Sequence, residues 1–368
     1  MQNEDERFMS IALQCAQRGR GAVEPNPMVG AVLVRDGVEL ARGWHKRFGF
    51  PHAEIEALSA ATEAGRDAGG ATMYVTLEPC CHSGKTPPCT DAMIEAGVAR
   101  VVVAMEDPDR HVAGKGLAAL REAGIEVVVG VLEAQARELL AAYVKLRTKG
   151  RPWVICKWAQ TPEGCLALPP ANGRWISGDE ARAHVHQLRG LCDGVCVGIG
   201  TVLADDPLLT NRSGTGRSPH RVVLDSRLRL PTGSWLATSA EACPVIVATT
   251  TEAMTADLAK VGELRQLGVE VLDLSASPEG VDLGALLDEL GRRQWTCLLV
   301  EGGAKVLRSF THGRLADELV VFTSATRCEP AEGLPRFDVA EVLPELSPRL
   351  AEERRFGADV MRRFVVSA

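Results

Sequence analysis

The stretch Glu78-Pro79-Cys80-Cys81-His82-Ser83-Gly84-Lys85-Thr86-Pro87-Pro88-Cys89, together with His52-Ala53-Glu54 upstream, determines how the first part of the chain is interpreted. His52, Cys80 and Cys89 supply one imidazole and two thiolates, which make three ligands for a tetrahedral Zn²⁺ and leave its fourth position for water. A zinc ion that only holds a fold normally has a fourth protein ligand. Glu54, two residues after the histidine, is suited to move protons to and from that water. The stretch therefore predicts zinc-dependent hydrolytic deamination.

The spacing of the motif matches a general signature in part. H-x-E followed by P-C-x-x-C is typical of zinc-dependent nucleobase deaminases, whereas here eight residues separate Cys80 from Cys89. Two plainer interpretations stay open: buried cysteines beside a hydrogen-bonded histidine, or a structural zinc closed by Cys81 or His82. A structural zinc leaves Glu54 without a role, which favours the catalytic interpretation.

Length and composition limit the class of protein. A chain of 368 residues predicts two domains, and its 46% apolar and 24% charged content is ordinary for a globular protein. The formal charge of −7 argues against a nucleic-acid partner. The acidic start of the chain lacks the apolar region of a signal peptide, and no apolar run is long enough for a membrane helix. Together with the odd count of 11 cysteines, this predicts a cytoplasmic protein without a membrane partner.

Hydrophobic periodicity predicts two successive α/β domains. In the first, helices are predicted at 4–18, 52–63, 88–96, 115–123 and 133–146, and strands at 29–34, 38–42, 72–77, 100–105 and 125–129. In the second, strands are predicted at 153–158, 194–197, 221–225, 245–249, 269–272 and 297–301, with helices between them, and terminal strands at 318–322 and 361–366 close the domain. The polar stretch 147–152 ends in proline and places the boundary between domains 1–147 and 148–368. Such alternation predicts largely parallel sheets with helices on both faces.

Four further motifs, together with the zinc motif, carry a resemblance to a known family. Pro25-Asn26-Pro27-Met28-Val29-Gly30, Gly43-Trp44-His45 and the zinc motif resemble the deaminase half of the bifunctional riboflavin-biosynthesis deaminase–reductases. The run Gly200-Thr201-Val202-Leu203-Ala204-Asp205-Asp206-Pro207-Leu208-Leu209-Thr210-Asn211-Arg212 and the run Val300-Glu301-Gly302-Gly303-Ala304 resemble their reductase half. The resemblance covers nearly the whole chain. It implies a cytidine-deaminase-like α/β/α domain followed by a dihydrofolate-reductase-like α/β domain.

The resemblance also implies two consecutive reactions on a phosphorylated ribosylaminopyrimidine. Water replaces the 2-amino group of 2,5-diamino-6-(5-phosphoribosylamino)pyrimidin-4-one, and NADPH then reduces the ribosyl to the ribityl side chain. One Zn²⁺ per chain and NADPH are the implied cofactors. In the first half, Glu54 is the implied catalytic residue beside the zinc ligands, and the implied substrate contacts are Asn26, His45, His82 and Lys85.

In the second half, no G-x-G-x-x-G is present, so a Rossmann fingerprint is absent. Glu301-Gly302-Gly303 instead joins a strand to a helix, where glycines let the backbone approach a pyrophosphate. By resemblance, the substrate contacts are Gly173, Arg189, Leu209, Arg212 and Glu301, with Lys157 as a further candidate near the reacting sugar. The implied cofactor contacts are Ala159, Trp175, Thr201, Asp205, Ser226, Gly303, Ala304, Lys305, Val306, Leu307, Arg308 and Ser309. We further expect Ser226-Arg227 to contact the 2′-phosphate that distinguishes NADPH from NADH.

Other functions stay open at this point. The nearest alternative is a deaminase whose second domain is inactive or has another specificity, because Thr161-Pro162-Glu163-Gly164 replaces the usual Ser-Leu-Asp-Gly of the family. A nucleic-acid-editing protein and a non-catalytic scaffold stapled by zinc are the remaining two. Related folds commonly assemble, so a homo-oligomer is expected.

Overall fold

The computed structural model describes residues 3–81, 87–110, 112–169, 175–328 and 334–366. The chain divides into two compact units, an N-terminal unit (Met1–Gly150) and a C-terminal unit (Arg151–Ala368). Helix α6 (Ala141–Lys149) ends at Gly150, whose φ of 67° lies in the left-handed region that favours glycine after a helix. The boundary expected between residues 147 and 148 falls inside this helix.

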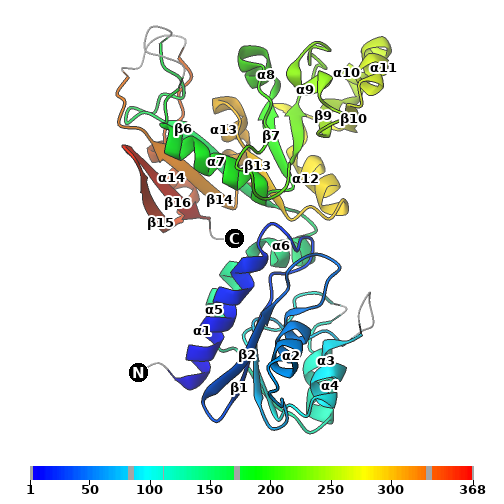
Figure 1. The fold of residues 1–368 in the computed structure, drawn as a ribbon. Helices are drawn as coiled ribbons and strands as arrows, with labels where there is room; N and C mark the ends of the chain where they lie inside the picture. Colours follow the sequence, from blue (N-terminus) through cyan, green and yellow to red (C-terminus); the bar gives the residue numbers. More distant parts are fainter. Residues whose placement is uncertain (1–2, 82–86, 111, 170–174, 329–333, 367–368) are drawn as a thin grey trace. The chain divides into compact units, whose positions relative to one another are not determined.

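The N-terminal unit is built on a five-stranded sheet with the order β2-β1-β3-β4-β5 (Figure 1). Its strands are β1 (Gly30–Arg35), β2 (Val38–Trp44), β3 (Thr72–Val75), β4 (Arg100–Val103) and β5 (Glu126–Val129). Strand β1 pairs antiparallel with both β2 and β3, whereas β3, β4 and β5 are parallel. The sheet is therefore mixed, because the β1–β2 hairpin turns at Asp36-Gly37 and β1 runs against the parallel strands.

Helices cover both faces of this sheet, as Figure 1 shows. Helices α1 (Glu4–Ala16), α5 (Glu133–Leu139) and α6 pack on one face, around Phe8, Val32 and Leu140. Helices α2 (Ala53–Glu63), α3 (Cys89–Glu95) and α4 (Lys115–Glu122) lie on the other, around Leu33 and Met93. The starts of α2 and α3 both lie on this second face, and they carry the histidine and one cysteine of the predicted metal site.

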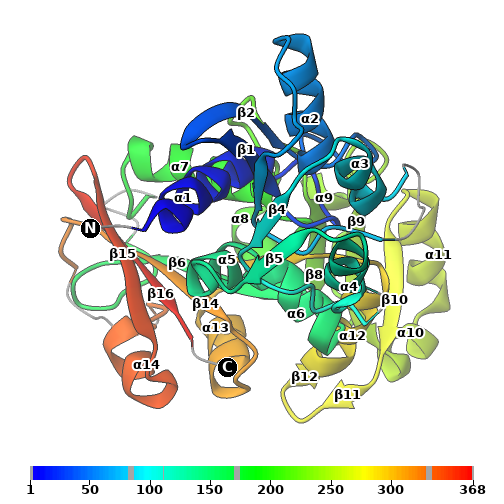
Figure 2. The ribbon, with the colours of Figure 1, turned by 90° about the horizontal axis from the view of Figure 1, so that it is seen from below.

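The C-terminal unit contains a nine-stranded sheet with the order β10-β9-β8-β7-β13-β6-β14-β16-β15. Its strands are β6 (Trp153–Gln160), β7 (Gly194–Gly198), β8 (His220–Leu224), β9 (Val245–Thr250), β10 (Glu270–Leu274), β13 (Cys297–Val300), β14 (Glu318–Thr323), β15 (Arg349–Phe356) and β16 (Asp359–Val365). The first seven strands in this order are parallel. The last two strands, β16 and β15, form an antiparallel hairpin (Figure 2). A separate two-stranded hairpin is formed by β11 (Ala276–Ser277) and β12 (Gly280–Val281).

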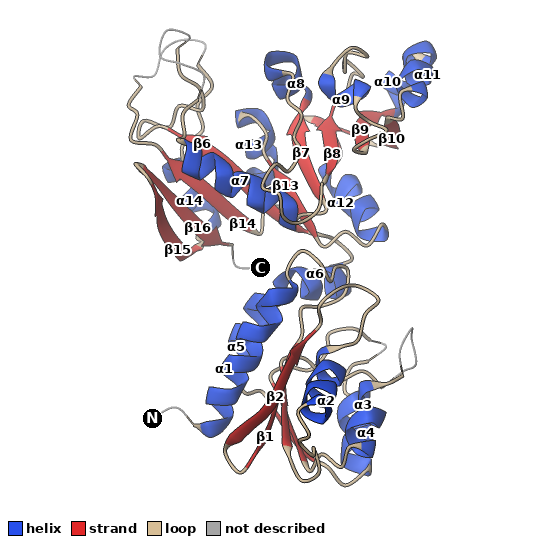
Figure 3. Cartoon of the chain, in the orientation of Figure 1, coloured by secondary structure: helices blue, strands red, loops and turns tan. Residues whose placement is uncertain are grey.

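Helices alternate with the parallel strands, which places them on both faces (Figure 3). Helices α7 (Asp179–Leu191), α8 (Ile199–Asp205), α9 (Trp235–Thr238) and α11 (Leu258–Gln266) pack on one face, and α12 (Leu283–Arg292), α13 (Ala304–His312) and α14 (Val339–Leu346) pack on the other. Helix α10 (Thr251–Ala256) follows β9. Each face has its own apolar core, and the two cores hold the parallel strands in place. Ligands of such sheets bind outside the carboxyl ends of the strands.

Several parts of the fold, including the β11–β12 hairpin, differ from the sequence-based expectations. The single helix expected at 133–146 is two helices, α5 and α6, which meet at Leu140. Helix α14 and strand β15 were not expected. Strand β15 was missed because its sequence, RLAEERRF, is charged and mostly exposed, as suits the edge of a sheet. Among the described residues, no helix has the length and apolar character that crossing a bilayer requires.

Candidate active sites

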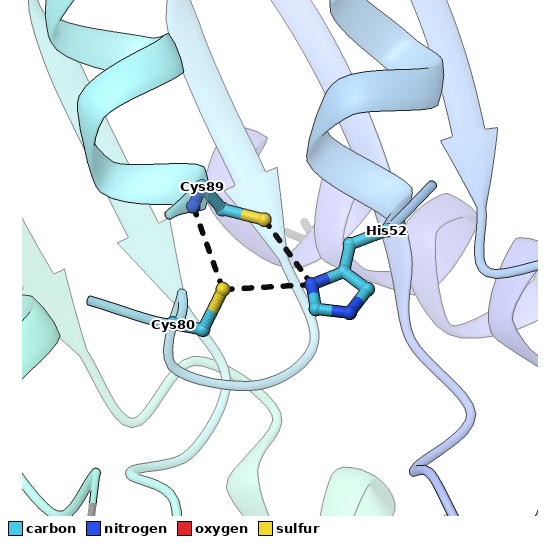
Figure 4. A group of neighbouring side chains, drawn as sticks. All are labelled: His52, Cys80 and Cys89. Atoms are coloured by element: carbon cyan, nitrogen blue, oxygen red, sulfur yellow. Dashed lines mark hydrogen bonds between the residues drawn. The ribbon is translucent and has the colours of Figure 1, made fainter. Parts of the chain in front are cut away.

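Three predicted metal ligands from separate elements meet in the N-terminal unit (Figure 4). His52 is the residue before α2, Cys80 follows β3, and Cys89 is the first residue of α3. The Nδ1 atom of His52 lies 3.5 Å from Cys80 Sγ and 3.3 Å from Cys89 Sγ. Tetrahedral bonds of about 2.0 Å to nitrogen and about 2.3 Å to sulfur place such atoms roughly 3.5 Å apart. The three donor atoms therefore fit a single Zn²⁺.

The contact between the two cysteines shifts the pKa values of their thiols in opposite directions. The hydrogen bond with Cys89 lowers the pKa of Cys80, and the same contact raises the pKa of Cys89. The backbone N–H of Cys89 also donates to Cys80 Sγ at 3.4 Å. Because this amide is at the start of a helix, it stabilises negative charge on the sulfur. Cys80 is thus the more readily ionised of the two sulfurs.

Glu54 lies beside the cluster in the first turn of α2. Its side chain is 3% exposed, and its Oε2 atom has no hydrogen-bond partner among the described residues. Burial raises the pKa of Glu54 to about 7. A buried carboxylate with an unsatisfied oxygen is suited to exchange protons with a ligand.

Asn26 and His45 form a second polar pair in the same cavity. Asn26 Nδ2 lies 3.3 Å from His45 Nε2, and His45 Nδ1 lies 3.0 Å from the Pro51 carbonyl oxygen. His45 is 2% exposed, and this burial lowers its pKa. The His45 ring meets the His52 ring edge-on, with centroids 5.3 Å apart. The structure thus brings two predicted substrate contacts to the metal ligands, whereas His82 and Lys85 lie outside the described residues.

The cavity that these residues line has a volume of about 320 Å³. Its wall also contains Asp107, Asp109, Tyr143 and Arg147, which the sequence analysis did not select. Tyr143 of α6 donates its hydroxyl to both carboxylate oxygens of Asp107, at 3.0 and 3.2 Å. Burial raises the pKa of Asp107 to about 6. Tyr143 and Arg147 are four positions apart and therefore lie on one face of α6, which could have indicated a shared role. Only the packing of α6 on the sheet shows that this face reaches the cavity.

A larger cleft of about 1630 Å³ lies in the C-terminal unit. It is lined by residues that follow the carboxyl ends of β7, β8 and β13, which is where parallel sheets usually bind ligands. The predicted contacts that line it are Lys157, Ala159, Trp175, Arg189, Thr201, Asp205, Leu209, Arg212, Ser226, Glu301, Gly303, Ala304, Lys305, Val306 and Ser309. Gly173 lies outside the described residues.

A buried charge cluster occupies one part of this cleft. Arg189 donates from Nε and Nη2 to the two carboxylate oxygens of Glu301, at 2.7 and 3.1 Å. Lys157 Nζ lies 3.8 Å from Glu301 Oε2. Burial favours the neutral form of Glu301, but Arg189 and Lys157 outweigh it and hold its pKa at about 2. Burial lowers the pKa of Lys157. The cluster presents two fixed cations and one fixed anion to a ligand.

Two of the predicted cofactor contacts do not line the cleft. Leu307 is fully buried in the core under α13, and the Arg308 guanidinium donates to the Arg336 carbonyl oxygen. Lys305 and Ser309 line the cleft and are one helical turn apart, whereas a residue two positions from Lys305 points to the opposite side of the helix. The expected contact run from Gly303 to Ser309 stays a prediction, and the side chains of Leu307 and Arg308 do not line the cleft.

The two residues expected to contact the 2′-phosphate differ in their position relative to the cleft. Ser226 lines the cleft, but Arg227 does not. Arg229, two residues later, does line it, and its Nε atom lies 4.0 Å from the buried Asp225 carboxylate. Trp235, which is 60% exposed, lies on the wall of the same cleft.

The two halves of the chain match two family models. Residues 2–105 match the cytidine and deoxycytidylate deaminase zinc-binding region, and residues 152–326 match the RibD C-terminal domain. The C-terminal unit thus has the reductase, dihydrofolate-reductase-like fold of that family, which implies a nicotinamide cofactor.

Whole proteins are similar over nearly the full length. The riboflavin biosynthesis protein RibD of Aquifex aeolicus is 40% identical over 97% of this chain and 97% of its own, and that of Escherichia coli K12 is 36% identical over 98% and 99%. The solved structure of a diaminohydroxyphosphoribosylaminopyrimidine deaminase/5-amino-6-(5-phosphoribosylamino)uracil reductase from Thermotoga maritima has a TM-score of 0.83 at 36% identity, covering 99% of both chains. Acinetobacter baumannii RibD gives 0.84 at 34% identity, with the same coverage. The chain belongs to the RibD family, the bifunctional deaminase–reductases that catalyse two steps of riboflavin biosynthesis.

Proposed function

We propose that the N-terminal unit removes the 2-amino group of 2,5-diamino-6-(5-phosphoribosylamino)pyrimidin-4-one. We propose further that the C-terminal unit reduces the ribosyl group of the product with NADPH. The observation that carries the first step is the ligand set of His52, Cys80 and Cys89 beside the buried Glu54, whose Oε2 atom has no hydrogen-bond partner among the described residues. The second step is supported by the charge cluster of Lys157, Arg189 and Glu301 in a cleft large enough for two ligands.

In the deaminase cavity, His52, Cys80 and Cys89 would hold one Zn²⁺. When bound, this ion supplies a Lewis acid that lowers the pKa of water to about 7. Glu54 accepts a proton and delivers it to the pyrimidine ring nitrogen, and it then assists the departure of ammonia. Asn26 holds the edge of the heterocycle, because an amide has both a donor and an acceptor. His45, the other predicted contact, orients the Asn26 amide through its Nε2 atom. His82 and Lys85 stay candidates for the remaining contacts, with Lys85 at the phosphate.

In the reductase cleft, we assign the cations according to what they contact. The Arg189 fork is engaged with Glu301, so it fixes the position of this carboxylate. Arg212 is exposed and lines the cleft, which suits it to bind the substrate phosphate. Lys157 and Glu301 lie together where they can hydrogen-bond the ribosyl oxygens. Gly173 and Leu209 are proposed as further substrate contacts on the family pattern.

NADPH is proposed to lie along the wall formed by α13 and the segment after β8. Gly303, Ala304, Lys305, Val306 and Ser309 line one side. Ala159, Trp175, Thr201, Asp205 and Ser226 are the other proposed contacts that line the cleft. Arg229 replaces Arg227 as the guanidinium that contacts the 2′-phosphate, since only Arg229 lines the cleft.

The proposal is tested on one preparation of the full chain. Metal analysis should find one zinc per chain, the diaminopyrimidinone should release ammonia, and the product should then oxidise NADPH. Ammonia release without NADPH oxidation would support the alternative of an inactive or differently specific reductase unit. Light scattering on the same preparation tests the expected homo-oligomer.

A further inference from the structure

Glu78 is a buried carboxylate near the metal site to which the proposed chemistry assigns no role. It lies two residues before Cys80, and its side chain is 4% exposed. Four backbone N–H groups donate to its two oxygens: Asp107 at 3.1 Å and Gly114 at 2.9 Å to Oε2, and Gly116 at 2.9 Å and Leu117 at 3.3 Å to Oε1. A single side chain thus satisfies amides from a segment that is 29 to 39 residues away in sequence.

Three of these donors belong to the start of α4. The first N–H groups of a helix have no partner within the helix, and they attract negative charge. The residue before α4, Gly114, has a φ of 79°, and no side chain of its own caps the helix. Glu78 therefore acts as the cap of a helix that is distant in sequence. The same hydrogen bonds hold the carboxylate in place and satisfy the N–H groups at the start of the helix.

A second contact holds the chain between Glu78 and Cys80. A Cβ atom on Gly116 would lie 2.1 Å from the Pro79 carbonyl oxygen and 3.2 Å from Glu78 Oε1. The backbone of Pro79 thus rests directly on the first turn of α4, in a space that only glycine leaves open. Both residues that precede Cys80 are held by the same helix start.

The same segment also forms the wall of the deaminase cavity. The N–H of Glu78 donates to the Met105 carbonyl oxygen at 3.0 Å, and Asp107, which follows, lines the cavity with Glu54. On the other side of Glu78, the Cys80 carbonyl oxygen accepts from the Thr90 N–H at 3.2 Å. Glu78 therefore connects the metal-ligand loop to the segment that contributes Asp107 to the cavity wall.

We propose that Glu78 is a positioning residue of the metal site, which holds the Cys80 sulfur at its ligating position by anchoring Pro79 to the start of α4. This inference rests on the proposed zinc-dependent function. It assigns to Glu78 a contribution to metal affinity rather than to the proton transfers. Loss of a partner that orients a metal ligand typically reduces metal affinity or activity by about 10- to 100-fold.

The test is the substitution Glu78→Gln in the full chain. The glutamine amide nitrogen would face backbone N–H groups instead of accepting from them, so about half of the acceptor capacity is lost. Competition with a chromophoric chelator should show zinc affinity reduced by about 10- to 100-fold. The visible spectrum of the Co²⁺-substituted protein should also change, because it reports the geometry of the thiolate ligands.

Two matched variants complete the experiment. Glu122→Gln removes the same charge from the exposed end of α4 and should leave zinc affinity and the cobalt spectrum unchanged. Gly116→Ala keeps the carboxylate but displaces Pro79, and it should weaken zinc binding as Glu78→Gln does. Far-UV circular dichroism of each variant controls for the folding of the N-terminal unit, because NADPH-dependent reduction reports only the other unit.

The metal measurements do not require turnover, so they separate this inference from the proposed function. The inference would be overturned if Glu78→Gln and Gly116→Ala both bound zinc with an affinity within twofold of that of Glu122→Gln and both gave the same cobalt spectrum as Glu122→Gln. Failure of the unaltered chain to deaminate, with these metal effects intact, would overturn the proposed function alone.

Discussion

The two candidate sites of this chain are built in different ways. In the N-terminal unit, the three metal ligands and Glu54 come from two short motifs, 52–54 and 78–89, at the starts of two helices. In the C-terminal unit, the cleft collects residues after several parallel strands, from Lys157 to Glu301 and beyond. A metal site requires particular ligand residues, and here they lie in two short motifs. A long cleft is instead formed by residues that are distant in sequence and are brought together by the fold. The compact site can therefore be predicted from the local sequence pattern, whereas the extent of the distributed site is seen only in the folded structure.

The largest expected effect concerns the compact site. Glu54→Ala should lower the deamination rate by about 10²- to 10⁴-fold, because the buried Glu54 carboxylate, with its unpaired Oε2 atom, is the proposed proton carrier beside the metal ligands. Zinc content and NADPH-dependent reduction should stay unchanged, since Glu54 is not a ligand and lies in the other unit. Ammonia release, metal analysis and NADPH oxidation measure the three quantities. Deamination at the unaltered rate would contradict the proposed proton transfers.

In the distributed site, a substitution in the charge cluster should lower the stability of the C-terminal unit. Glu301→Gln leaves Lys157 and Arg189 buried side by side without their anion, which should destabilise the C-terminal unit by about 3–5 kcal/mol. Tryptophan fluorescence during urea unfolding reports this unit, because only Trp44 of the six tryptophans lies in the other one. The control is Glu263→Gln on the exposed face of α11. Equal unfolding midpoints for the two variants would show that the cluster does not stabilise the fold.

A smaller effect should distinguish two neighbouring arginines. Arg229→Ala should raise the KM for NADPH by about 10- to 100-fold and leave that for NADH unchanged, because hydrogen bonds to a charged group contribute about 1.5–3 kcal/mol. Arg227→Ala, whose side chain does not line the cleft, is the matched control. Steady-state kinetics with both cofactors provide the measurement. A changed NADPH preference in Arg227→Ala instead would restore the sequence-based hypothesis.

The smallest expected effect is a pH dependence of opposite sign in the two units. Glu301 has a pKa of about 2, below its ordinary 4.5, so its contribution to stability is present above about pH 4.5 and is lost as the pH falls towards 2. Asp107 has a pKa of about 6, above its ordinary 3.8, so its ionisation opposes folding as the pH rises from about 4 to 6. Thermal unfolding of Glu301→Gln and Asp107→Asn between pH 3 and 7 should remove each dependence. Profiles that match the unaltered chain would contradict the assignment.

The parts of the fold that sequence predicts are those with a strong local pattern. The alternating strands and helices, the hairpin at Asp36-Gly37 and the zinc ligands all follow from residue types and short spacings. The break between α5 and α6 at Leu140 does not, because apolar periodicity continues through it and only packing on the sheet imposes the change. Tyr143 and Asp107 were missed for the same reason: their hydroxyl–carboxylate contact joins α6 to a loop 36 residues away.

The Asn26–His45–Pro51 chain determines what the deaminase cavity can recognise. The Pro51 oxygen can only accept, so it requires the proton on His45 Nδ1, and the neutral ring then accepts from the Asn26 amide through Nε2. This commits one amide N–H of Asn26 and leaves its oxygen and its second N–H to a ligand. A loop carbonyl thereby determines, through two relayed hydrogen bonds, which hydrogen-bonding groups of Asn26 remain for the edge of a heterocycle.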